Sequence, residues 1–215
     1  MICGVDEAGR GPVIGPLVVA AVMVDNERSL RRLKVKDSKL LTKARREQLY
    51  PKIMESARVE VAVITADDID RFRDEESLNL LEVQHFAALI DRLIPEKVFV
   101  DAADVVEERF GRLICDRLVC RPTMVSCHRA DAKYPVVSAA SVVAKVTRDR
   151  LIEEIAQQIG EPIGSGYPTD PVTRAFLEKW IREKGDFPPH TRRSWRTAKE
   201  IYSLSKVCKL TDWMD

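Results

Sequence analysis

The chain has 215 residues, of which 45% are hydrophobic and 32% are charged, a composition typical of one compact globular protein. Thirty-five Lys and Arg residues against 34 Asp and Glu residues give a net charge of +1, so bulk charge does not by itself indicate a polyanionic partner. Charged residues interrupt every apolar run before it reaches membrane-spanning length, and no secretory signal pattern opens the chain. We therefore expect a cytosolic protein without a membrane segment.

Three apolar runs early in the chain predict strands, at residues 2–5, 17–24 and 59–64. Turn residues separate the first two strands, at Gly9-Arg10-Gly11-Pro12 and at Gly15-Pro16. Two capped helices are expected, one from Thr42 to about Ala57 and one from Ser77 to about Leu93.

The second half of the chain alternates strands and helices before it becomes mainly helical. The segment KVFVDA (97–102) predicts a strand that is covered on both faces. Further elements are expected near 105–118 (helix), near 122–127 (strand) and from about Pro135 to Ile159 (helix). This order predicts an α/β protein with a mixed five-stranded sheet flanked by helices. We expect one domain over residues 1–160, and a helical extension with a tail over 161–215.

The five cysteines are odd in number and scattered: Cys3, Cys115, Cys120, Cys127 and Cys208. This pattern favours reduced thiols over a disulfide framework. Cys120, Cys127 and His128 have the residue types of zinc ligands, but no CxxC pair supports a zinc site.

Two carboxylates, Asp6 and Glu7, interrupt the first apolar strand, where buried charge is unfavourable unless it is paired or bound to a metal. Asp101 ends the predicted central strand, and Asp131 precedes the long helix. Because strand ends and helix termini meet at one edge of an open sheet, these four acids can converge. Each of Asp101 and Asp131 alone could instead be a strand-end cap or a loop residue.

Converging carboxylates repel one another unless cations neutralise them, and Mg²⁺ or Mn²⁺ prefers such oxygen ligands. Two such ions about 4 Å apart can activate a water molecule and stabilise the leaving oxygen during phosphodiester hydrolysis. Basic residues gather in segments 31–39, 43–46 and 190–199. One such cluster is usually a solvated helix face, but three together make a nucleic-acid-binding face an equal alternative.

Five motifs, in order along the chain, closely resemble the archaeal form of ribonuclease HII, the type 2 ribonuclease H family: GVDEAGRGPVIGPLVVAAV, VKDSKLLT, VFVDA, HRADAKYPVVSAASVVAKVTRDR and GSGYPTDP. The resemblance runs from Cys3 to about Lys199. It implies an RNase H-like fold with a C-terminal helical extension, and hydrolysis of the RNA strand of RNA–DNA hybrids. It also implies incision of duplex DNA on the 5′ side of an embedded ribonucleotide, which leaves a 3′ hydroxyl and a 5′ phosphate.

The same resemblance implies that Asp6, Glu7, Asp101 and Asp131 are the catalytic residues and the ligands of two Mg²⁺ or Mn²⁺ ions. Asp149 is a fifth acid in this region, which we interpret as a pairing or helix-surface residue.

The turn Gly9-Arg10-Gly11 matches the family's glycine-arginine-glycine motif. Its glycines permit close backbone approach, so the backbone of the turn can contact a ribose 2′-hydroxyl and the adjacent phosphate. By itself such a sequence is usually only a tight turn. Tyr167 matches the family's tyrosine that packs against the sugar and hydrogen-bonds the 2′-hydroxyl; the alternative is a loop residue packed on the core.

Several basic and hydroxyl residues are candidates for phosphate contacts, and each could equally be a solvated surface residue: Ser38, Lys39, Arg46, Lys145 and the segment 190–199. For His128 and His190, a core or surface position is the default interpretation, and proton transfer to the leaving oxygen is the weaker alternative.

In the tail, Leu210, Trp213 and Met214 form an apolar trio at one-turn spacing. The pattern resembles the terminal peptide with which archaeal replication and repair enzymes bind the sliding clamp, except that Val207 stands where the motif usually has glutamine. Alternatively, the tail folds back onto the helical extension. We expect a monomer that acts on RNA–DNA hybrids and on ribonucleotide-containing duplex DNA, with the clamp as a further partner.

Two other functions stay open at this point. A related nuclease that cuts all-DNA substrates, such as a resolvase, would not need the glycine-arginine-glycine turn or Tyr167. A catalytically silent nucleic-acid-binding module would not need the four acids.

Overall fold

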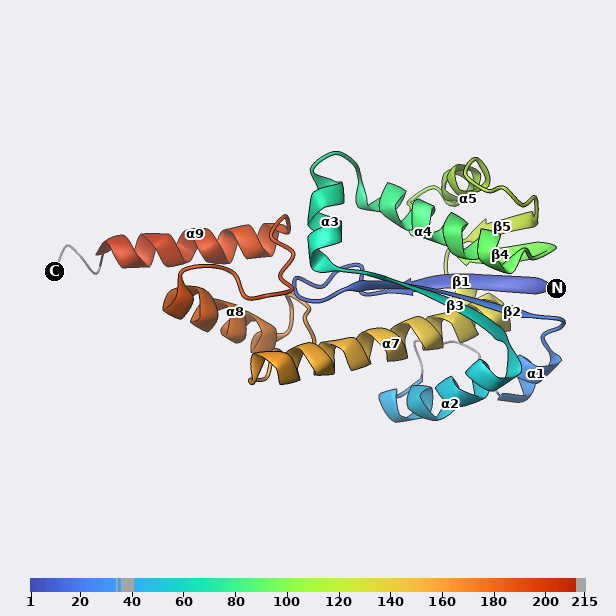
Figure 1. Ribbon diagram of the computed structural model, residues 1–215, viewed down its shortest axis with the longest axis horizontal. Coiled ribbons are helices and arrows are strands. Elements are labelled where there is room, and N and C mark those ends of the chain that lie inside the picture. The colour runs from blue at the N-terminus through green and yellow to red at the C-terminus, as the bar shows by residue number, and fades with distance from the viewer. Residues whose placement is uncertain (34, 36–40, 212–215) are drawn as a thin grey trace. The chain divides into compact units, whose positions relative to one another are not determined.

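The computed structural model describes residues 1–33, 35 and 41–211 (Figure 1). The chain forms two compact units, each made of segments that are separate in sequence. The first unit contains Met1–Ala8, Val18–Val63 and Glu76–Arg148, and the second contains Gly9–Leu17, Ile64–Glu75 and Asp149–Asp215. The sequence-based division after residue 160 stays a prediction.

Within the described residues of the first unit, five strands form one sheet in the order β3-β2-β1-β4-β5. Their bounds are β1 Ile2–Ala8, β2 Leu17–Val24, β3 Arg58–Ile64, β4 Lys97–Asp101 and β5 Thr123–Cys127. Strand β1 is antiparallel to β2 and parallel to β4, which is in turn parallel to β5. The prediction of a mixed five-stranded sheet is confirmed, and Val98, Phe99 and Val100 of β4 are buried as expected of a covered strand.

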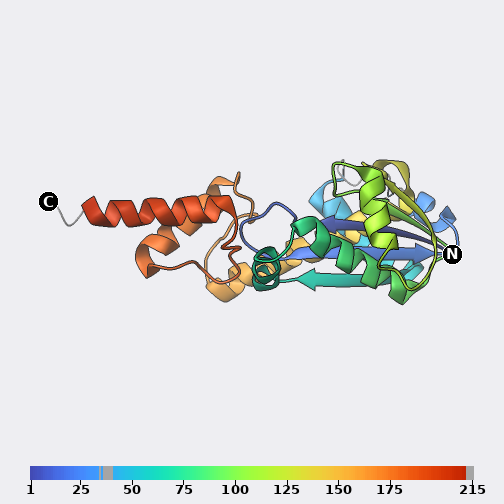
Figure 2. The ribbon, with the colours of Figure 1, turned by 90° about the horizontal axis from the view of Figure 1, so that it is seen from above.

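Helices cover both faces of this sheet (Figures 1 and 2). On one face lie α4 (Leu78–Leu93) and α5 (Glu107–Cys115), and on the other lie α1 (Arg28–Leu33), α2 (Lys43–Ser56) and the first part of α7 (Pro135–Ile159). The predicted caps are present, since Thr42 accepts a hydrogen bond from the Arg45 N–H and Ser77 accepts one from the Leu80 N–H. Across the described residues, none of the helices combines the length and the apolar character that a membrane span requires.

The second unit is mainly helical beyond residue 160, as predicted. It contains α3 (Ala66–Arg73), the end of α7 from Asp149, α8 (Pro171–Lys184) and α9 (Arg196–Thr211), and α8 packs along α9 (Figure 1). Apolar side chains from α7, α8 and α9, from the loop after β1 and from the loop between α7 and α8 form a core in this unit: Val13, Ile14, Ile152, Ile155, Ile163, Phe176, Leu177, Ile181, Ala198 and Ile201. The loop after β1 is therefore anchored by its own apolar residues.

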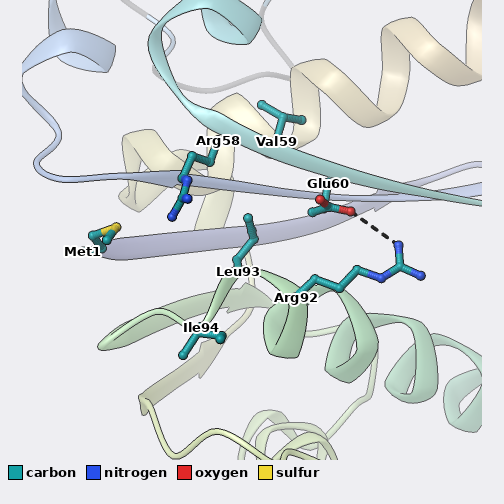
Figure 3. Close-up of a pocket in the computed structure, with 7 residues that line it drawn as sticks. All are labelled: Met1, Arg58, Val59, Glu60, Arg92, Leu93 and Ile94. Atoms are coloured by element: carbon teal, nitrogen blue, oxygen red, sulfur yellow. Dashed lines mark hydrogen bonds and ion pairs between the residues drawn. The ribbon is translucent and has the colours of Figure 1, made fainter.

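A hollow lies in the first unit where β1 begins (Figure 3). Met1, the first residues of β3 and the end of α4 line it, and two of the lining residues, Arg92 and Glu60, form an ion pair of 3.4 Å. Its lining contains none of the four predicted catalytic acids, which lie toward the other end of β1 or on other elements.

At Gly4, the backbone of β1 lies close to the backbone at the beginning of α7. A methyl group added there would lie 2.5 Å from the Val137 nitrogen and would overlap the Val136 carbonyl, and backbone cannot move aside as a flexible side chain can. We expect Gly4→Ala to lower the free energy of unfolding by about 3 kcal/mol, the upper end of the usual effect of overpacking. Urea unfolding measures this.

Gly160→Ala is the control, because nothing lies within 4 Å of an added methyl group there and only the positive φ of 83° opposes the change. That variant should lose about 1 kcal/mol. Equal losses in the two variants would contradict a close contact between β1 and α7.

Candidate active site

The register of the parallel strands brings two of the predicted acids to neighbouring positions. The pairing of β1 with β4 ends at Val5 opposite Val100, and the next residues on the two strands are Asp6 and Asp101. Asp101 also pairs with Cys127 at the end of β5. The acids of β1 and β4 therefore lie at one end of the sheet, as expected where adjacent parallel strands end together.

A hydrogen bond links the helix that carries Asp131, the fourth acid, to the end of β4. The Ala130 N–H donates to the Asp101 Oδ1 atom at 3.0 Å, and Asp131 is the next residue of the short helix α6 (Ala130–Lys133). Arg129 turns the chain into this helix through a positive φ of 54°. Asp131 is buried at 1% exposure, so its carboxyl group is held inside the fold beside the end of β4.

Asp6 lies in an environment that opposes its ionisation. Burial raises the pKa of the Asp6 carboxyl well above its usual range, and the negative charges of Glu7 and Asp101 raise it further. A hydrogen bond from Ser141 and the positive charge of Lys145 act in the opposite direction on this pKa. The Lys145 ammonium itself donates to the Ser141 Oγ atom at 2.8 Å.

Ser141 and Lys145 thus form a short polar chain that leads from α7 to Asp6. Ser141 was not among the residues predicted from the sequence, although its spacing of four residues from Lys145 places the two side chains on one helix face. The expected contact between Lys145 and phosphate stays a prediction.

The acids have the chemistry of a hard metal site. Asp6, Glu7, Asp101 and Asp131 offer only carboxylate oxygens, the ligands that Mg²⁺ and Mn²⁺ prefer, and a cation would offset the repulsion at Asp6. Among the described residues, no group of three or more His, Cys, Asp or Glu side chains has the arrangement of a metal site. The residue types fit divalent ions, whereas the metal site itself stays a prediction.

The zinc alternative gains no support from the structure. Cys120 and Cys127 are free thiols and belong to no metal-binding group among the described residues. The His128 ring contacts the Glu107 carboxylate at 3.0 Å and the Asp104 carbonyl at 2.7 Å. His128 therefore packs against the beginning of α5 and the loop that follows β4, in agreement with a structural role.

In the second unit, the structure brings the glycine-arginine-glycine turn together with Tyr167. Gly9 has a positive φ of 89°, and a methyl group added at Gly11 would lie 3.6 Å from the Tyr167 ring. The Gly166 carbonyl accepts hydrogen bonds from the Val13 N–H at 2.8 Å and from the Ile14 N–H at 3.2 Å, which holds the two loops side by side. Tyr167 is 37% exposed, so it is not the core-packed loop residue of the alternative interpretation.

Hydrogen bonds to the beginning of α8 hold the loop that carries Tyr167. The Asp170 carboxylate accepts the Ser165 N–H at 2.6 Å and the Val172 N–H at 2.9 Å. The buried Thr173 hydroxyl accepts the Gly166 N–H at 3.0 Å and donates to the Ile163 carbonyl at 2.9 Å. These bonds leave the loop little conformational freedom.

Arg192 is a buried residue that sequence analysis placed only within the basic segment 190–199. Its guanidinium donates to three carbonyls of the loop after β1, those of Gly9 (2.6 Å), Arg10 (3.0 Å) and Gly15 (3.0 Å). It is 0% exposed, whereas a phosphate contact is expected at a surface residue, and the phosphate role of the segment 190–199 stays a prediction. No local pattern in the sequence could have indicated these contacts.

The remaining predicted residues lie on several different elements. The Arg46 guanidinium donates to the Leu41 carbonyl at 2.7 Å, and the His190 carbonyl accepts the Gly15 N–H at 2.9 Å. Asp149 lies in the part of α7 that belongs to the second unit. Leu210 belongs to α9 by its backbone. Four predicted residues lie outside the described part of the chain: Ser38, Lys39, Trp213 and Met214.

A mixed sheet that carries acids at the ends of two adjacent parallel strands agrees with the RNase H-like fold that the sequence motifs imply. The family model for ribonuclease HII matches residues 3–198. A ribonuclease HII from Thermococcus kodakarensis is 50% identical over 204 residues, which cover 93% of this chain and 89% of the relative. This chain belongs to the ribonuclease HII family, which confirms the resemblance seen in its motifs.

Two solved structures agree with this assignment. The crystal structure of ribonuclease H2 from Pyrococcus horikoshii matches with a TM-score of 0.89 at 46% identity, covering 95% of this chain and 98% of that chain. The RNase HII of a PCNA:RNase HII complex from Archaeoglobus fulgidus matches with a TM-score of 0.86 at 42% identity, covering 94% and 96%. The chain is an enzyme of the nuclease class that hydrolyses RNA in RNA–DNA hybrids.

Proposed function

We propose that this enzyme, besides cleaving the RNA strand of hybrids, incises duplex DNA on the 5′ side of an embedded ribonucleotide and leaves a 3′ hydroxyl and a 5′ phosphate. The observation that carries the proposal is the cluster of Asp6, Glu7 and Asp101, whose charges interact at one end of the sheet. Such a cluster suits phosphodiester hydrolysis, in which negative charge develops on the attacking and leaving oxygens.

In this proposal Asp6, Glu7, Asp101 and Asp131 hold two Mg²⁺ or Mn²⁺ ions. When bound, two ions can activate a water molecule and stabilise the leaving oxygen. The protein supplies the fixed carboxylates: the Asp101 Oδ1 atom is held by the Ala130 N–H, and the Asp6 Oδ1 atom by the Glu7 N–H at 2.8 Å. Ser141 and Lys145 favour the ionised form of Asp6, the form that binds a cation.

Substrate selection in this proposal belongs to the loops of the second unit. The backbone of Gly9, Arg10 and Gly11 contacts the ribose 2′-hydroxyl and the adjacent phosphate, while Tyr167 packs against the sugar and hydrogen-bonds the same hydroxyl. The contact between the Tyr167 ring and the Gly11 position supports this assignment, because one ribose can then touch both. The 2′-hydroxyl is the group that distinguishes RNA from DNA at a given nucleotide.

Phosphate contacts and the sliding clamp complete the proposal. We propose that Ser38, Lys39, Arg46 and Lys145 contact the substrate backbone, which positions a duplex without recognising its sequence.

We also propose that the apolar trio Leu210, Trp213 and Met214 binds the sliding clamp. The solved complex of PCNA with the RNase HII of Archaeoglobus fulgidus, whose chain resembles this one at 42% identity, supports this partner.

The first prediction from the proposed function concerns the charge of the metal site. Asp101→Asn keeps an oxygen that can accept the Ala130 N–H but removes a ligand charge, so hybrid cleavage should fall roughly 100-fold or more while folding and hybrid binding persist. Steady-state cleavage, circular dichroism and a binding titration measure the three quantities.

Asp91→Asn is the matched control, because the Asp91 carboxylate accepts the N–H groups of Val119 and Cys120 outside the acid cluster. It should cleave normally. Near-parental turnover of Asp101→Asn would contradict the two-metal assignment.

A second prediction concerns recognition of the sugar. Tyr167→Ala should reduce cleavage at a single embedded ribonucleotide, because the ribose loses both the ring and the hydroxyl, and metal affinity should change much less. Tyr167→Phe keeps the ring and isolates the hydroxyl, so its activity should lie between those of Tyr167→Ala and the parent. Activity of Tyr167→Ala equal to that of the parent on this substrate would remove Tyr167 from the site.

A third prediction concerns the tail. Deleting Leu210–Asp215 should abolish association with the organism's sliding clamp and leave hydrolysis of a short hybrid intact, because the apolar trio is the proposed anchor. Isothermal calorimetry measures the association, and thermal unfolding is the control for stability. If the full-length enzyme does not bind the clamp, or if the truncated enzyme unfolds, the tail is structural and the clamp proposal is wrong.

A further inference from the structure

The buried guanidinium of Arg192 has an unusual set of acceptors. Its Nε, Nη1 and Nη2 atoms donate to the carbonyls of Gly15, Arg10 and Gly9, three residues of one loop. Burying a charged group is unfavourable unless hydrogen bonds replace its hydration. The loop carbonyls are therefore part of what keeps Arg192 inside the second unit, and Arg192 in turn fixes their direction.

The direction of two carbonyls determines the direction of two amides. The Gly9 carbonyl shares a peptide plane with the Arg10 N–H, and the Arg10 carbonyl shares one with the Gly11 N–H. No described peptide bond is cis, and in a planar trans peptide the C=O and N–H groups point in opposite directions. Because the carbonyls face the buried Arg192, the N–H groups of Arg10 and Gly11 face the opposite side of the turn, where Gly11 is exposed.

The segment that carries Arg192 is itself held in place. The Arg192 N–H donates to the Val13 carbonyl at 2.8 Å, and the Arg192 guanidinium lies 4.9 Å from the centre of the Trp195 ring. Asp70 of α3 accepts the Arg193 N–H at 2.6 Å, the Ser194 N–H at 3.1 Å and the Ser194 hydroxyl at 2.6 Å. Helix α3 thus clamps the residues that follow Arg192 and limits how far its side chain can move.

We infer that Arg192 is a positioning residue for sugar selection, which orients the Arg10 and Gly11 amides toward a ribose 2′-hydroxyl and its adjacent phosphate. The inference rests on the proposed role of the turn Gly9-Arg10-Gly11. An amide that already points toward the substrate site loses less conformational entropy when the substrate binds. The 2′-hydroxyl that it contacts therefore contributes more to the binding free energy. Lysine cannot replace this arginine, because one ammonium group cannot reproduce a planar fork of donors to three carbonyls.

The test measures binding to two duplexes that differ by one 2′-hydroxyl. In the full-length Asp101→Asn background, in which cleavage is expected to be at least 100-fold slower, the affinity for a duplex with a single ribonucleotide is compared with that for the same all-DNA duplex. We expect Arg192→Lys to reduce the ratio of these affinities roughly tenfold, the effect of about one hydrogen bond, with a much smaller change in affinity for the all-DNA duplex. Asp70→Ala removes the carboxylate that holds the residues after Arg192. It should reduce the ratio of affinities by a smaller factor than Arg192→Lys does.

Two controls separate positioning from a general loss of stability. Arg174→Lys changes an arginine on the surface of α8, where it pairs with Glu178 at 3.7 Å. Ile181→Val weakens the core of the second unit without removing a hydrogen bond, because the Ile181 side chain is apolar. Both should keep the parental ratio of affinities, even where thermal unfolding shows that Ile181→Val is less stable than the parent.

The outcomes are distinct. An unchanged ratio in Arg192→Lys overturns the inference and leaves the proposed sugar selection standing. The inference is also overturned, and the proposed sugar selection still stands, if Ile181→Val reduces the ratio of affinities as much as Arg192→Lys does. If Arg192→Lys does not fold, Asp70→Ala decides, since an unchanged ratio in that variant overturns the inference. If the parent itself shows no preference for the ribonucleotide, the proposed sugar selection and the inference both fail.

Discussion

Asp6 lies buried on the central strand of the sheet, where loss of hydration and the charges of Glu7 and Asp101 all oppose its ionisation. Such a carboxylate cluster is retained in a fold only if something offsets the repulsion, and Ser141 with Lys145 does so in part. The parallel pairing of β1 with β4 makes the cluster, because it sets Asp6 and Asp101 at successive positions beyond Val5 and Val100. The proposed divalent ions would complete the compensation and convert a destabilising arrangement into a catalytic one.

The second unit contains a buried positive charge, whereas the first unit contains buried negative charges. Arg192 is satisfied by loop carbonyls, and this arrangement fixes a turn that follows the acids of β1 by only one residue in sequence. The chain passes from the first unit to the second between Ala8 and Gly9. The residues proposed for chemistry and those proposed for sugar recognition thus lie in consecutive segments of the chain, and different sets of contacts hold them.

Much of this arrangement could be predicted because its causes are local. The caps at Thr42 and Ser77 and the apolar strands follow from short patterns, and parallel strand order predicts that Asp6 and Asp101 meet. Helix α3 was not among the elements expected from the sequence, although Thr65 and Asp68 form a capping box. Arg192 could not be found from sequence, because its carbonyl partners lie 177 to 183 residues earlier in the chain.

The central claim is that the four acids perform metal-dependent hydrolysis at a position chosen by a 2′-hydroxyl. The most direct measurement incubates the purified protein, with and without magnesium, with a DNA duplex that carries one ribonucleotide and with the same duplex made entirely of DNA. The account predicts cleavage of the first duplex alone, on the 5′ side of the ribonucleotide, only with the metal, and with a 3′ hydroxyl on the upstream fragment. Equal cleavage of the all-DNA duplex, or binding of the first duplex without any cleavage in magnesium or manganese, would contradict it.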